Sequence, residues 1–399
     1  MSNLQKEFLR AKLRKLPLEP PMPLHAPHGL SIFPEGPDEA VEASDELPHS
    51  PLTDDSSSAS SASSTGTIRP SNFHRPLQPR KKTNFDPIPW NTHFSSSLLL
   101  PTPDGSSTFH IYITLPSTGP LFVFHHGAGS SGLSSALLAT SIRSLLPTAG
   151  ILSFDCRGHG ETTTGDDHDL SLSTLSQDMA TVLSLTASHF GWEKLPDLVL
   201  VGHSLGGAVV VDVAKRGEFR DCVIGYCVID VVEGSAMDAL QSMQTYLSTR
   251  PDGFETVEQA IEWHNRTRTL RNPLSARISV PALLHPSPPT STSRHPWTWR
   301  TDLSSTQPFW ENWFIGLSSK FLSASGGKLL ILAGTDRLDK ELMIGQMQGK
   351  YQLIVVPEAG HFVHEDVPEK TAAVLVEFYK RNDRSALVLP PKMTAVKKA

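Results

Sequence analysis

The sequence predicts an α/β protein with a mostly parallel sheet and helices on both of its faces. Short β-branched runs alternate with longer stretches of helical periodicity, which is the pattern of repeated βαβ units. Several runs are continuously apolar rather than alternating, as expected for strands covered on both faces. The expected strands are 110–115, 121–125, 151–155, 198–201, 223–232, 328–333 and 352–356, and the expected helices are 133–146, 175–189, 206–216 and 368–381.

Composition divides the 399-residue chain into a folded part and two tails. Residues 1–82 are rich in Pro and Ser and cannot bury enough apolar surface to offset their ordering entropy, so we expect a disordered tail. A single folded domain is expected over 83–385 and a flexible tail over 386–399. A net charge of −6 argues against a protein that coats nucleic acid, and no apolar run is long enough to cross a membrane.

The N-terminus lacks an apolar signal segment, and the cysteines are few and set among apolar residues. Buried, reduced thiols at Cys156, Cys222 and Cys227 indicate a cytoplasmic or nuclear protein that is not secreted.

A long insert, about 234–325, follows the run at 223–232, which is the fifth of the strands named above and the sixth of the expected fold. A single crossover helix needs far fewer residues, so we expect a lid or a partner-binding surface over the site. A helix is expected at 255–269 and a flexible loop at 287–293. The insert also holds Arg and Trp residues that could anchor a partner, although solvated helix faces and core aromatics explain them as well: Arg266, Arg268, Arg271, Arg277, Trp297, Trp299, Trp310 and Trp313.

The chemistry is concentrated in Gly202-His203-Ser204-Leu205-Gly206, which matches the nucleophile elbow G-x-S-x-G between a predicted strand and a predicted helix. Ser204 would take a strained turn that lifts its hydroxyl above the sheet. Side chains at positions 202 and 206 would collide with neighbouring backbone, which accounts for the glycines. Ser204 is therefore the expected nucleophile.

A serine hydroxyl needs an adjacent base, and His361 lies just after the last predicted strand, in the chain order Ser, acid, His. His364 is the rival, but it is further from the strand end. The spacing of the two histidines is not that of the H-E-x-x-H zinc motif, so we expect no metal and no cofactor.

Two backbone amides are needed to stabilise an oxyanion. One is the N–H of Leu205, directly after the nucleophile. The other should come from the glycine-rich loop after the strand 121–125, where we favour Ala128 over Gly129. A phosphate-binding loop is the competing interpretation, but neither G-x-G-x-x-G nor a Walker motif is present.

The acid has two candidates. Asp336 occupies the usual position after the penultimate strand, beside Arg337. Asp230 lies one strand earlier in an apolar run, where a carboxylate is costly unless a donor such as a histidine N–H meets it. The apolar surroundings favour Asp230 as the acid, whereas the position that the acid usually occupies in such folds favours Asp336.

Around these residues the chain resembles the protein phosphatase methylesterase 1 family of the α/β-hydrolase superfamily. The motifs that carry the resemblance are spread over the folded region, and the blocks starting at Ile229 and Ile344 are specific to this family. They are residues 84–90, 158–162, 202–207, 229–240, 260–263, 299–300, 309–314, 336–340, 344–350 and 360–366.

The resemblance implies a serine carboxylesterase, without cofactor, that demethylates the C-terminal leucine of the protein phosphatase 2A catalytic subunit. It implies a triad of Ser204, Asp230 and His361, with Asp230 rather than Asp336 as the acid. The phosphatase would be both substrate and partner of a monomeric enzyme that binds neither nucleic acid nor membrane. A generic small-ester hydrolase and a non-catalytic phosphatase-binding inhibitor are the alternatives.

Three departures from the family pattern stand out. Leu205 replaces a Met common in the family's elbow, the insert between Leu284 and His295 is short and Ser/Pro-rich, and the first 82 residues share little beyond proline content.

Overall fold

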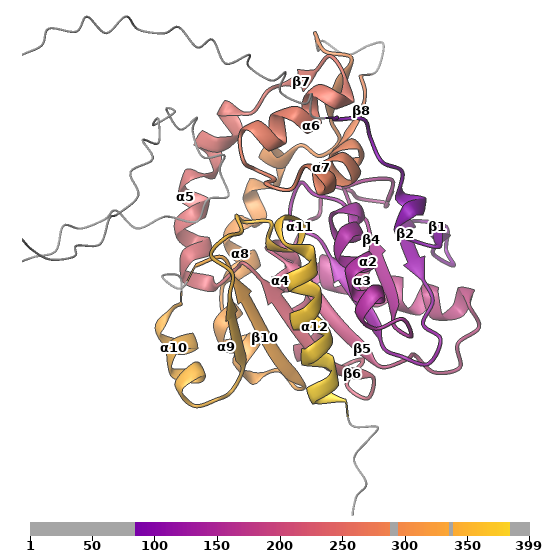
Figure 1. Ribbon diagram of the computed structural model, residues 1–399, viewed down its shortest axis with the longest axis vertical. Helices are drawn as coiled ribbons and strands as arrows, with labels where there is room; N and C mark the ends of the chain where they lie inside the picture. Colours follow the sequence, from indigo (N-terminus) through magenta and orange to yellow (C-terminus); the bar gives the residue numbers. More distant parts are fainter. Residues whose placement is uncertain (1–83, 288–293, 335–337, 384–399) are drawn as a thin grey trace, which may run out of the picture.

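The computed structural model describes residues 84–287, 294–334 and 338–383, and these form a twisted sheet with helices on both faces (Figure 1). The sheet has the order β1-β2-β4-β3-β5-β6-β10-β11. β1 and β2 are antiparallel to their neighbours, and from β4 to β11 all pairs are parallel. The strands are β1 Ser96–Pro101, β2 Thr108–Thr114, β3 Leu121–His125, β4 Gly150–Phe154, β5 Leu198–His203, β6 Val223–Ile229, β10 Gly327–Leu332 and β11 Gln352–Val355.

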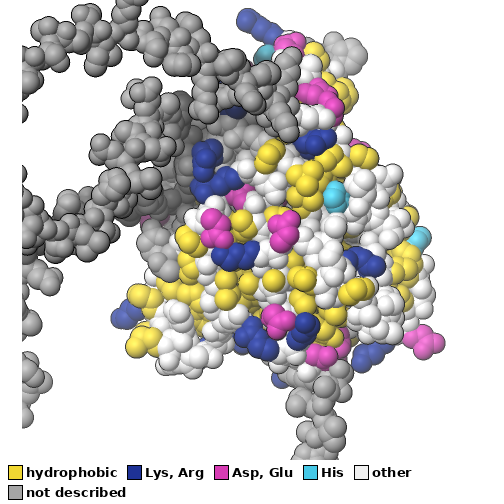
Figure 2. All heavy atoms as spheres, viewed as in Figure 1, with side chains coloured by type: hydrophobic (Ala, Val, Ile, Leu, Met, Phe, Trp, Pro, Cys, Tyr) yellow, Lys and Arg dark blue, Asp and Glu magenta, His cyan; other side chains and the backbone are white. Residues whose placement is uncertain are grey.

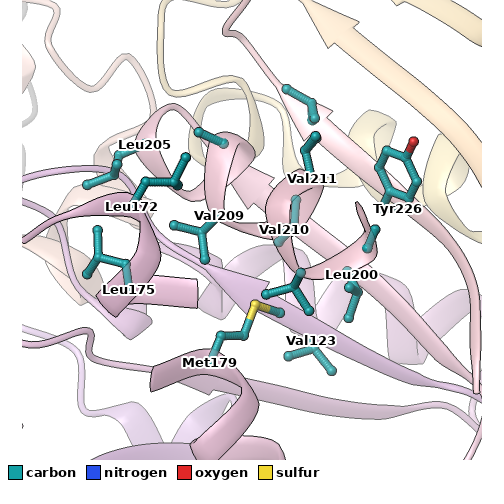
Figure 3. Packing of buried hydrophobic residues seen from close by; sticks show 14 of the residues in the cluster. Val123, Leu172, Leu175, Met179, Leu200, Leu205, Val209, Val210, Val211 and Tyr226 are labelled. Atoms are coloured by element: carbon teal, nitrogen blue, oxygen red, sulfur yellow. The ribbon is translucent and has the colours of Figure 1, made fainter. Parts of the chain in front are cut away.

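Each face of the sheet has its own hydrophobic core. On one face lie α2 (Ala136–Leu145) and α12 (Pro368–Asn382), and on the other lie α3 (Leu172–His189), α4 (Leu205–Arg216) and α9 (Leu317–Ser323). Figure 3 shows Val209 and Val210 of α4 packed over Val123 and Leu200 of the central strands, with Met179 of α3 beside them. All five side chains are almost fully buried, so close packing fixes the position of α4 on the central strands.

The predicted fold class is confirmed, and each expected strand and helix of the sheet framework is present within a few residues. The strand expected over 223–232 ends earlier, at Ile229, because Asp230 adopts a positive φ of 54° that turns the chain away from the sheet. The structure also contains β1, an edge strand, and the helix α5 (Glu233–Thr249), which were not predicted from the sequence.

The insert between β6 and β10 contains several helices and a small antiparallel sheet of order β7-β9-β8. In Figure 1 this small sheet and the neighbouring helices α6 and α7 lie at the top of the view, and α5 runs down the left side. Its predicted helix corresponds to α6, and its expected loop falls largely outside the described residues. Trp310 and Trp313 are buried in the main core, so the core explanation holds for these two. The remaining elements are β7 Gly253–Phe254, α6 Val257–Arg266, α7 Pro273–Ser279, η3 Val280–Leu283, β8 Leu284–Pro286, β9 Trp297–Trp299, η4 Leu303–Phe309 and α8 Trp310–Phe314 within the insert, and η1 Trp90–Thr92, η2 Gly132–Ser135, α10 Lys340–Met347 and α11 Val363–Asp366 outside it.

The surface mixes charges and apolar groups. On the face shown in Figure 2, acidic and basic side chains are interspersed among apolar ones over the described part of the molecule. Within the described ranges, no helix has the length and apolarity that a membrane crossing requires. The two terminal tails of the sequence analysis lie outside the described residues.

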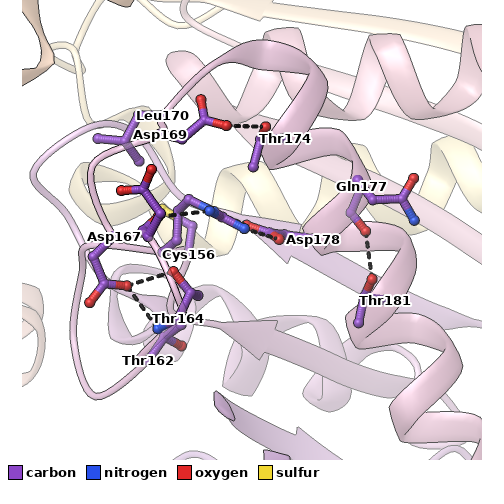
Figure 4. Close-up of polar contacts among 12 residues, drawn as sticks. Cys156, Thr162, Thr164, Asp167, Asp169, Leu170, Thr174, Gln177, Asp178 and Thr181 are labelled. Atoms are coloured by element: carbon purple, nitrogen blue, oxygen red, sulfur yellow. Dashed lines mark hydrogen bonds and ion pairs between the residues drawn. The ribbon is translucent and has the colours of Figure 1, made fainter. Parts of the chain in front are cut away.

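An ion pair anchors the loop between β4 and α3. Arg157 Nε donates to Asp178 Oδ2 at 2.6 Å and its NH2 group donates to Oδ1 at 2.7 Å, with both side chains about nine-tenths buried (Figure 4). Asp167 in the same loop accepts from the Thr164 backbone N–H and hydroxyl (Figure 4). This loop contains the segment Gly158-His159-Gly160, so the ion pair helps to position residues close to the elbow.

We predict that Asp178→Asn lowers the free energy of unfolding by about 3 kcal/mol, because it removes the carboxylate that pairs directly with the buried Arg157 guanidinium. Urea denaturation measures the loss. Glu377→Gln is the matched control, since Glu377 pairs with Lys380 at 3.0 Å on the surface with both side chains more than half exposed. The control should change stability by less than about 0.5 kcal/mol, and similar losses in both variants would contradict the account.

Candidate active site

The nucleophile elbow is a strained turn between β5 and α4. Ser204 has φ 52° and ψ −122°, a conformation that L-residues rarely adopt, and it stands immediately before the first residue of α4. Its N–H donates to Ile229 O at 3.0 Å, which ties the turn to the neighbouring strand β6. A Cβ on Gly202 would lie 2.1 Å from Gly206 O, and a Cβ on Gly206 would lie 2.1 Å from His125 O. The structure therefore confirms that a side chain at either glycine position would collide with neighbouring backbone.

Asp230 and His361 meet beside this turn although 131 residues separate them. Nδ1 of His361 donates to Asp230 Oδ2 at 2.9 Å, and Asp230 is fully buried. The other carboxylate oxygen accepts the Ala333 N–H at 2.8 Å, and the Asp230 N–H donates to Ile331 O at 2.8 Å. β6 and β10 thus fix the acid, and the histidine N–H is the donor that a buried carboxylate requires. Asp336, the rival acid, lies outside the described residues.

The loop that carries His361 is held in place by groups from other elements. His203 Nε2 donates to the His361 carbonyl at 3.0 Å. Arg271 from the insert donates to Glu358 O at 3.0 Å, and its backbone N–H donates to Asp366 Oδ1 at 2.8 Å. Arg271 therefore supports the histidine loop and is not an exposed anchor. His364, the rival base, is buried against the His203 ring at a centroid distance of 4.5 Å.

The loop after β3 presents its backbone to the elbow. Its position is set by His126, whose Nδ1 donates to Gly127 O at 2.8 Å and whose Nε2 accepts the Cys156 N–H at 3.0 Å. Burial lowers the pKa of His126 well below its usual value, which keeps the ring neutral. A Cβ on Gly127 would lie 3.1 Å from Ser204 Cβ, so the loop backbone closely approaches the nucleophile.

The two candidates for the second oxyanion donor differ in how their amides are used. The Gly129 N–H donates to His159 Nε2 at 2.8 Å. Within the described part of the chain, the Ala128 and Leu205 amides donate to no protein acceptor. Leu205 is the first residue of α4, where amides are unpaired and the helix dipole favours negative charge. The geometry therefore favours Ala128 over Gly129.

The elbow, the histidine and the loop after β3 border a pocket of about 900 Å³, a volume that includes its open mouth. Ser204, His361 and the loop after β3 line one part of it, and the insert supplies most of the remaining walls. The insert residues are mostly apolar or aromatic, with a few polar groups among them: Met243, Tyr246, Arg250, His264, Thr269, Leu270, Ser279, Leu283, Trp299, Leu303, Thr306, Trp310 and Trp313. Such a composition suits a largely apolar ligand with a small number of polar contacts.

The sequence analysis missed the residues that α5 contributes to this pocket. Met243, Tyr246 and Arg250 have helical spacing of three and four residues, which places them along one side of α5 and its C-terminus. That spacing was the available signal, but it does not show which element the helix faces. Among the described residues, no group of His, Cys, Asp and Glu side chains forms a metal site.

Glu365 also lines the pocket and has an unusual environment. It is almost fully buried, and its Oε2 accepts the Ser275 hydroxyl at 2.8 Å and the Ser279 hydroxyl at 2.7 Å. Burial raises its pKa to about 8, against the opposing effect of the two hydroxyl hydrogen bonds. The carboxyl group is therefore largely protonated at neutral pH.

We predict that Glu365→Gln changes the pH dependence of stability. Because the folded-state pKa lies above the unfolded value, unfolding releases a proton between about pH 4.5 and 8, and wild-type stability falls as pH rises through this window. Gln cannot titrate, so the variant should gain in unfolding free energy relative to wild type from pH 5 to 8, by at most about 1.4 kcal/mol per pH unit.

Urea denaturation across this range measures the difference, with the exposed Glu369→Gln as the control. A difference between variant and wild type that does not change with pH would show that Glu365 is ionised in the folded state.

Comparisons with known proteins agree with the fold and identify the family. Residues 122–374 match the model of the alpha/beta hydrolase family. Among solved structures, E-2-(acetamidomethylene)succinate hydrolase superposes with a TM-score of 0.56 at 19% identity, covering 71% of this chain and 100% of that one, which supports the fold alone.

Curated relatives are much more similar. Protein phosphatase methylesterase 1 of Aspergillus fumigatus is 54% identical, covering 98% of this chain and 92% of the relative. The protein of the same name from Gibberella zeae is 58% identical over 83% and 84% of the two chains. These similarities confirm the resemblance and the carboxylic-ester hydrolase class, and the chain belongs to the protein phosphatase methylesterase 1 family of α/β hydrolases.

Proposed function

We propose that this protein demethylates the C-terminal leucine methyl ester of the protein phosphatase 2A catalytic subunit, which is its substrate and binding partner. Ser204 is the nucleophile, His361 the general base and Asp230 the residue that orients the histidine. The observation that carries the proposal is the 2.9 Å contact between His361 Nδ1 and the buried Asp230, placed beside a strained serine elbow in a chain of this family.

In the first half of the reaction, the Ser204 oxygen attacks the ester carbonyl while His361 Nε2 takes the hydroxyl proton. The bond from His361 Nδ1–H to Asp230 leaves Nε2 as the basic nitrogen and stabilises the imidazolium that forms. The Ala128 and Leu205 amides donate to the tetrahedral oxyanion. His361 then gives its proton to the methoxy oxygen, and the bond between this oxygen and the carbonyl carbon breaks. Methanol departs, and the acyl group remains bound to Ser204 as an acyl-enzyme.

In the second half, His361 takes a proton from water as the water oxygen attacks the acyl carbonyl. The tetrahedral intermediate collapses, the bond to the Ser204 oxygen breaks, and His361 returns the proton to Ser204. The product is the free C-terminal carboxylate. No group other than those already described is required for either half.

The largely apolar insert walls suit an apolar C-terminal side chain such as leucine. A generic small-ester hydrolase would share the triad but would gain nothing from an intact protein substrate. A non-catalytic inhibitor would bind the phosphatase without needing Ser204.

Ser204→Ala should abolish methanol release from methylated phosphatase and labelling by a fluorophosphonate probe. It removes the attacking oxygen, so the rate should fall by several orders of magnitude while the melting temperature stays near that of wild type. Wild type should also cleave intact methylated phosphatase faster than p-nitrophenyl acetate or the isolated tail peptide. Residual labelling near the wild-type level would contradict the assignment of Ser204, and equal rates on all substrates would favour the generic hydrolase.

Asp230→Asn should lower kcat on p-nitrophenyl acetate by on the order of 10⁴-fold, because an amide favours the wrong histidine tautomer. A small ester separates this chemical effect from protein binding. Asn tolerates the left-handed backbone at position 230, so the fold should persist. Asp221→Asn, at an exposed site, is the control and should retain full activity. If Asp336→Asn were inactive and Asp230→Asn active, Asp336 would be the acid.

A further inference from the structure

The pocket wall contains a guanidinium group for which the described residues supply no carboxylate partner. Arg250 follows the last residue of α5, and its guanidinium carbon lies 3.8 Å from the centroid of the Trp299 ring. Trp299 Nε1 donates to the Pro251 carbonyl at 2.8 Å, so the same indole supports the cation and fixes the peptide next to it. Both residues line the pocket that contains Ser204 and His361. The arrangement is therefore a fixed platform rather than a mobile surface arginine.

No counter-charge for Arg250 is found in the described part of the chain. Its Nε is buried without a hydrogen-bond partner there, and no described carboxylate lies within 4 Å of its nitrogens. Asp302, the carboxylate whose charge acts on Arg250, accepts the Ser304 N–H at 2.9 Å as the cap of η4. A charged group without a partner in a largely apolar pocket is destabilising.

The other titratable groups of the pocket do not supply the missing charge. Glu365 is bonded by two serine hydroxyls, and its raised pKa of about 8 leaves it mostly neutral. Burial lowers the pKa of His264 to about 4, and the nearby Arg250 charge contributes to this shift. Burial also raises the pKa of Tyr246, which keeps its hydroxyl protonated. Among the described residues that line the pocket, none neutralises the charge of Arg250.

We propose that Arg250, held on the face of Trp299, is a specificity-determining residue that binds the carboxylate of an acidic side chain in the substrate's tail, a few residues before the esterified C-terminus. A carboxylate matches the forked donors of a guanidinium and supplies the opposite charge, whereas a main-chain carbonyl supplies only a dipole. The substrate class is thus an acidic peptide ester, and this assignment rests on the proposed function of the pocket.

Two carboxylates could reach Arg250, namely an acidic side chain of the substrate and the C-terminal carboxylate of the product. The product carboxylate forms at Ser204, between the oxyanion donors. Arg250 contacts Trp299 and Leu247, and it makes no hydrogen bond or ion pair with Ser204, Asp230 or His361 in the described structure. Because no described contact links Arg250 to the triad, we assign it to the acidic side chain, and peptides that differ in these two carboxylates distinguish the sources.

The test uses acetylated peptide leucine methyl esters with one Asp placed one, two, three or four residues before the leucine, each paired with its Asn twin. At the favoured position, wild type should prefer the Asp peptide by about 10- to 100-fold in kcat/KM, which is the range expected for a hydrogen bond to a charged group. The preference should arise chiefly from a lower KM. Arg250→Gln should bring this ratio close to one, and Arg250→Lys should retain part of it. An Arg that only packs against Trp299 would, when replaced, lower both rates equally and leave the ratio unchanged.

A binding arm makes the test independent of turnover. Ser204→Ala protein, with and without Arg250→Gln, is titrated with the methyl-ester, free-acid and carboxamide forms of the Asp and Asn peptides. The proposal predicts tighter binding of every Asp form and loss of that preference with Arg250→Gln. A preference for the free acid over the ester in the Asn series that disappears with Arg250→Gln would assign Arg250 to the product carboxylate and overturn the proposal.

The absence of any Asp preference at all four positions would also overturn it. Failure of the proposed function has a different signature, because wild type would then leave all leucine methyl esters intact while still hydrolysing p-nitrophenyl acetate. In that case the binding arm alone decides the role of Arg250.

Discussion

Close backbone packing at the turn between β5 and α4 is the constraint on which the site depends. A Cβ at Gly206 would lie 2.1 Å from His125 O, so the first turn of α4 is pressed against the end of β3. The strained backbone of Ser204 persists because the turn is fixed from several sides, including the bond from its N–H to Ile229 O. The same contact brings the β3 loop, with its Ala128 amide, to the nucleophile. The proposed nucleophile and the proposed oxyanion donors are therefore positioned by one packing arrangement, which the buried valines of α4 hold against the sheet.

Buried neutral histidines form a second layer of support beneath this turn. His126 and His159 position the β3 loop, and His203 positions the carbonyl of His361. Burial lowers the pKa of all three, so each can accept or donate at a fixed nitrogen without acquiring a charge. His159 has a direct consequence for the chemistry, because it occupies the Gly129 amide and leaves Ala128 as the available donor. Residues with no role in proton transfer thus decide which amides face the substrate.

Local sequence patterns predicted much of the fold, and they singled out residues that the structure brings together at the candidate site. Ser204 and His361 are readable because the elbow motif and the strand before His361 are contiguous in sequence. β1 was not predicted because an antiparallel edge strand with partly exposed residues lacks the continuous apolar run of the central strands. α5 was missed because only Ala236 and Ala239 are buried along it. The choice between Ala128 and Gly129, and the placement of Arg250 over Trp299, depend on partners 30 and 49 residues away, which no local pattern reveals.

The central claim is that Ser204 attacks an ester whose oxyanion lies between the Ala128 and Leu205 amides, with His361 and Asp230 behind it. A crystal structure of the protein after reaction with a phosphonate ester tests this directly, because the adduct mimics the tetrahedral intermediate. The account predicts phosphorus bonded to Ser204 Oγ, a phosphoryl oxygen about 2.7–3.1 Å from both amides, and the Gly129 N–H still on His159. A phosphoryl oxygen bound to the Gly129 amide with His159 displaced, or an adduct on another residue, would contradict it.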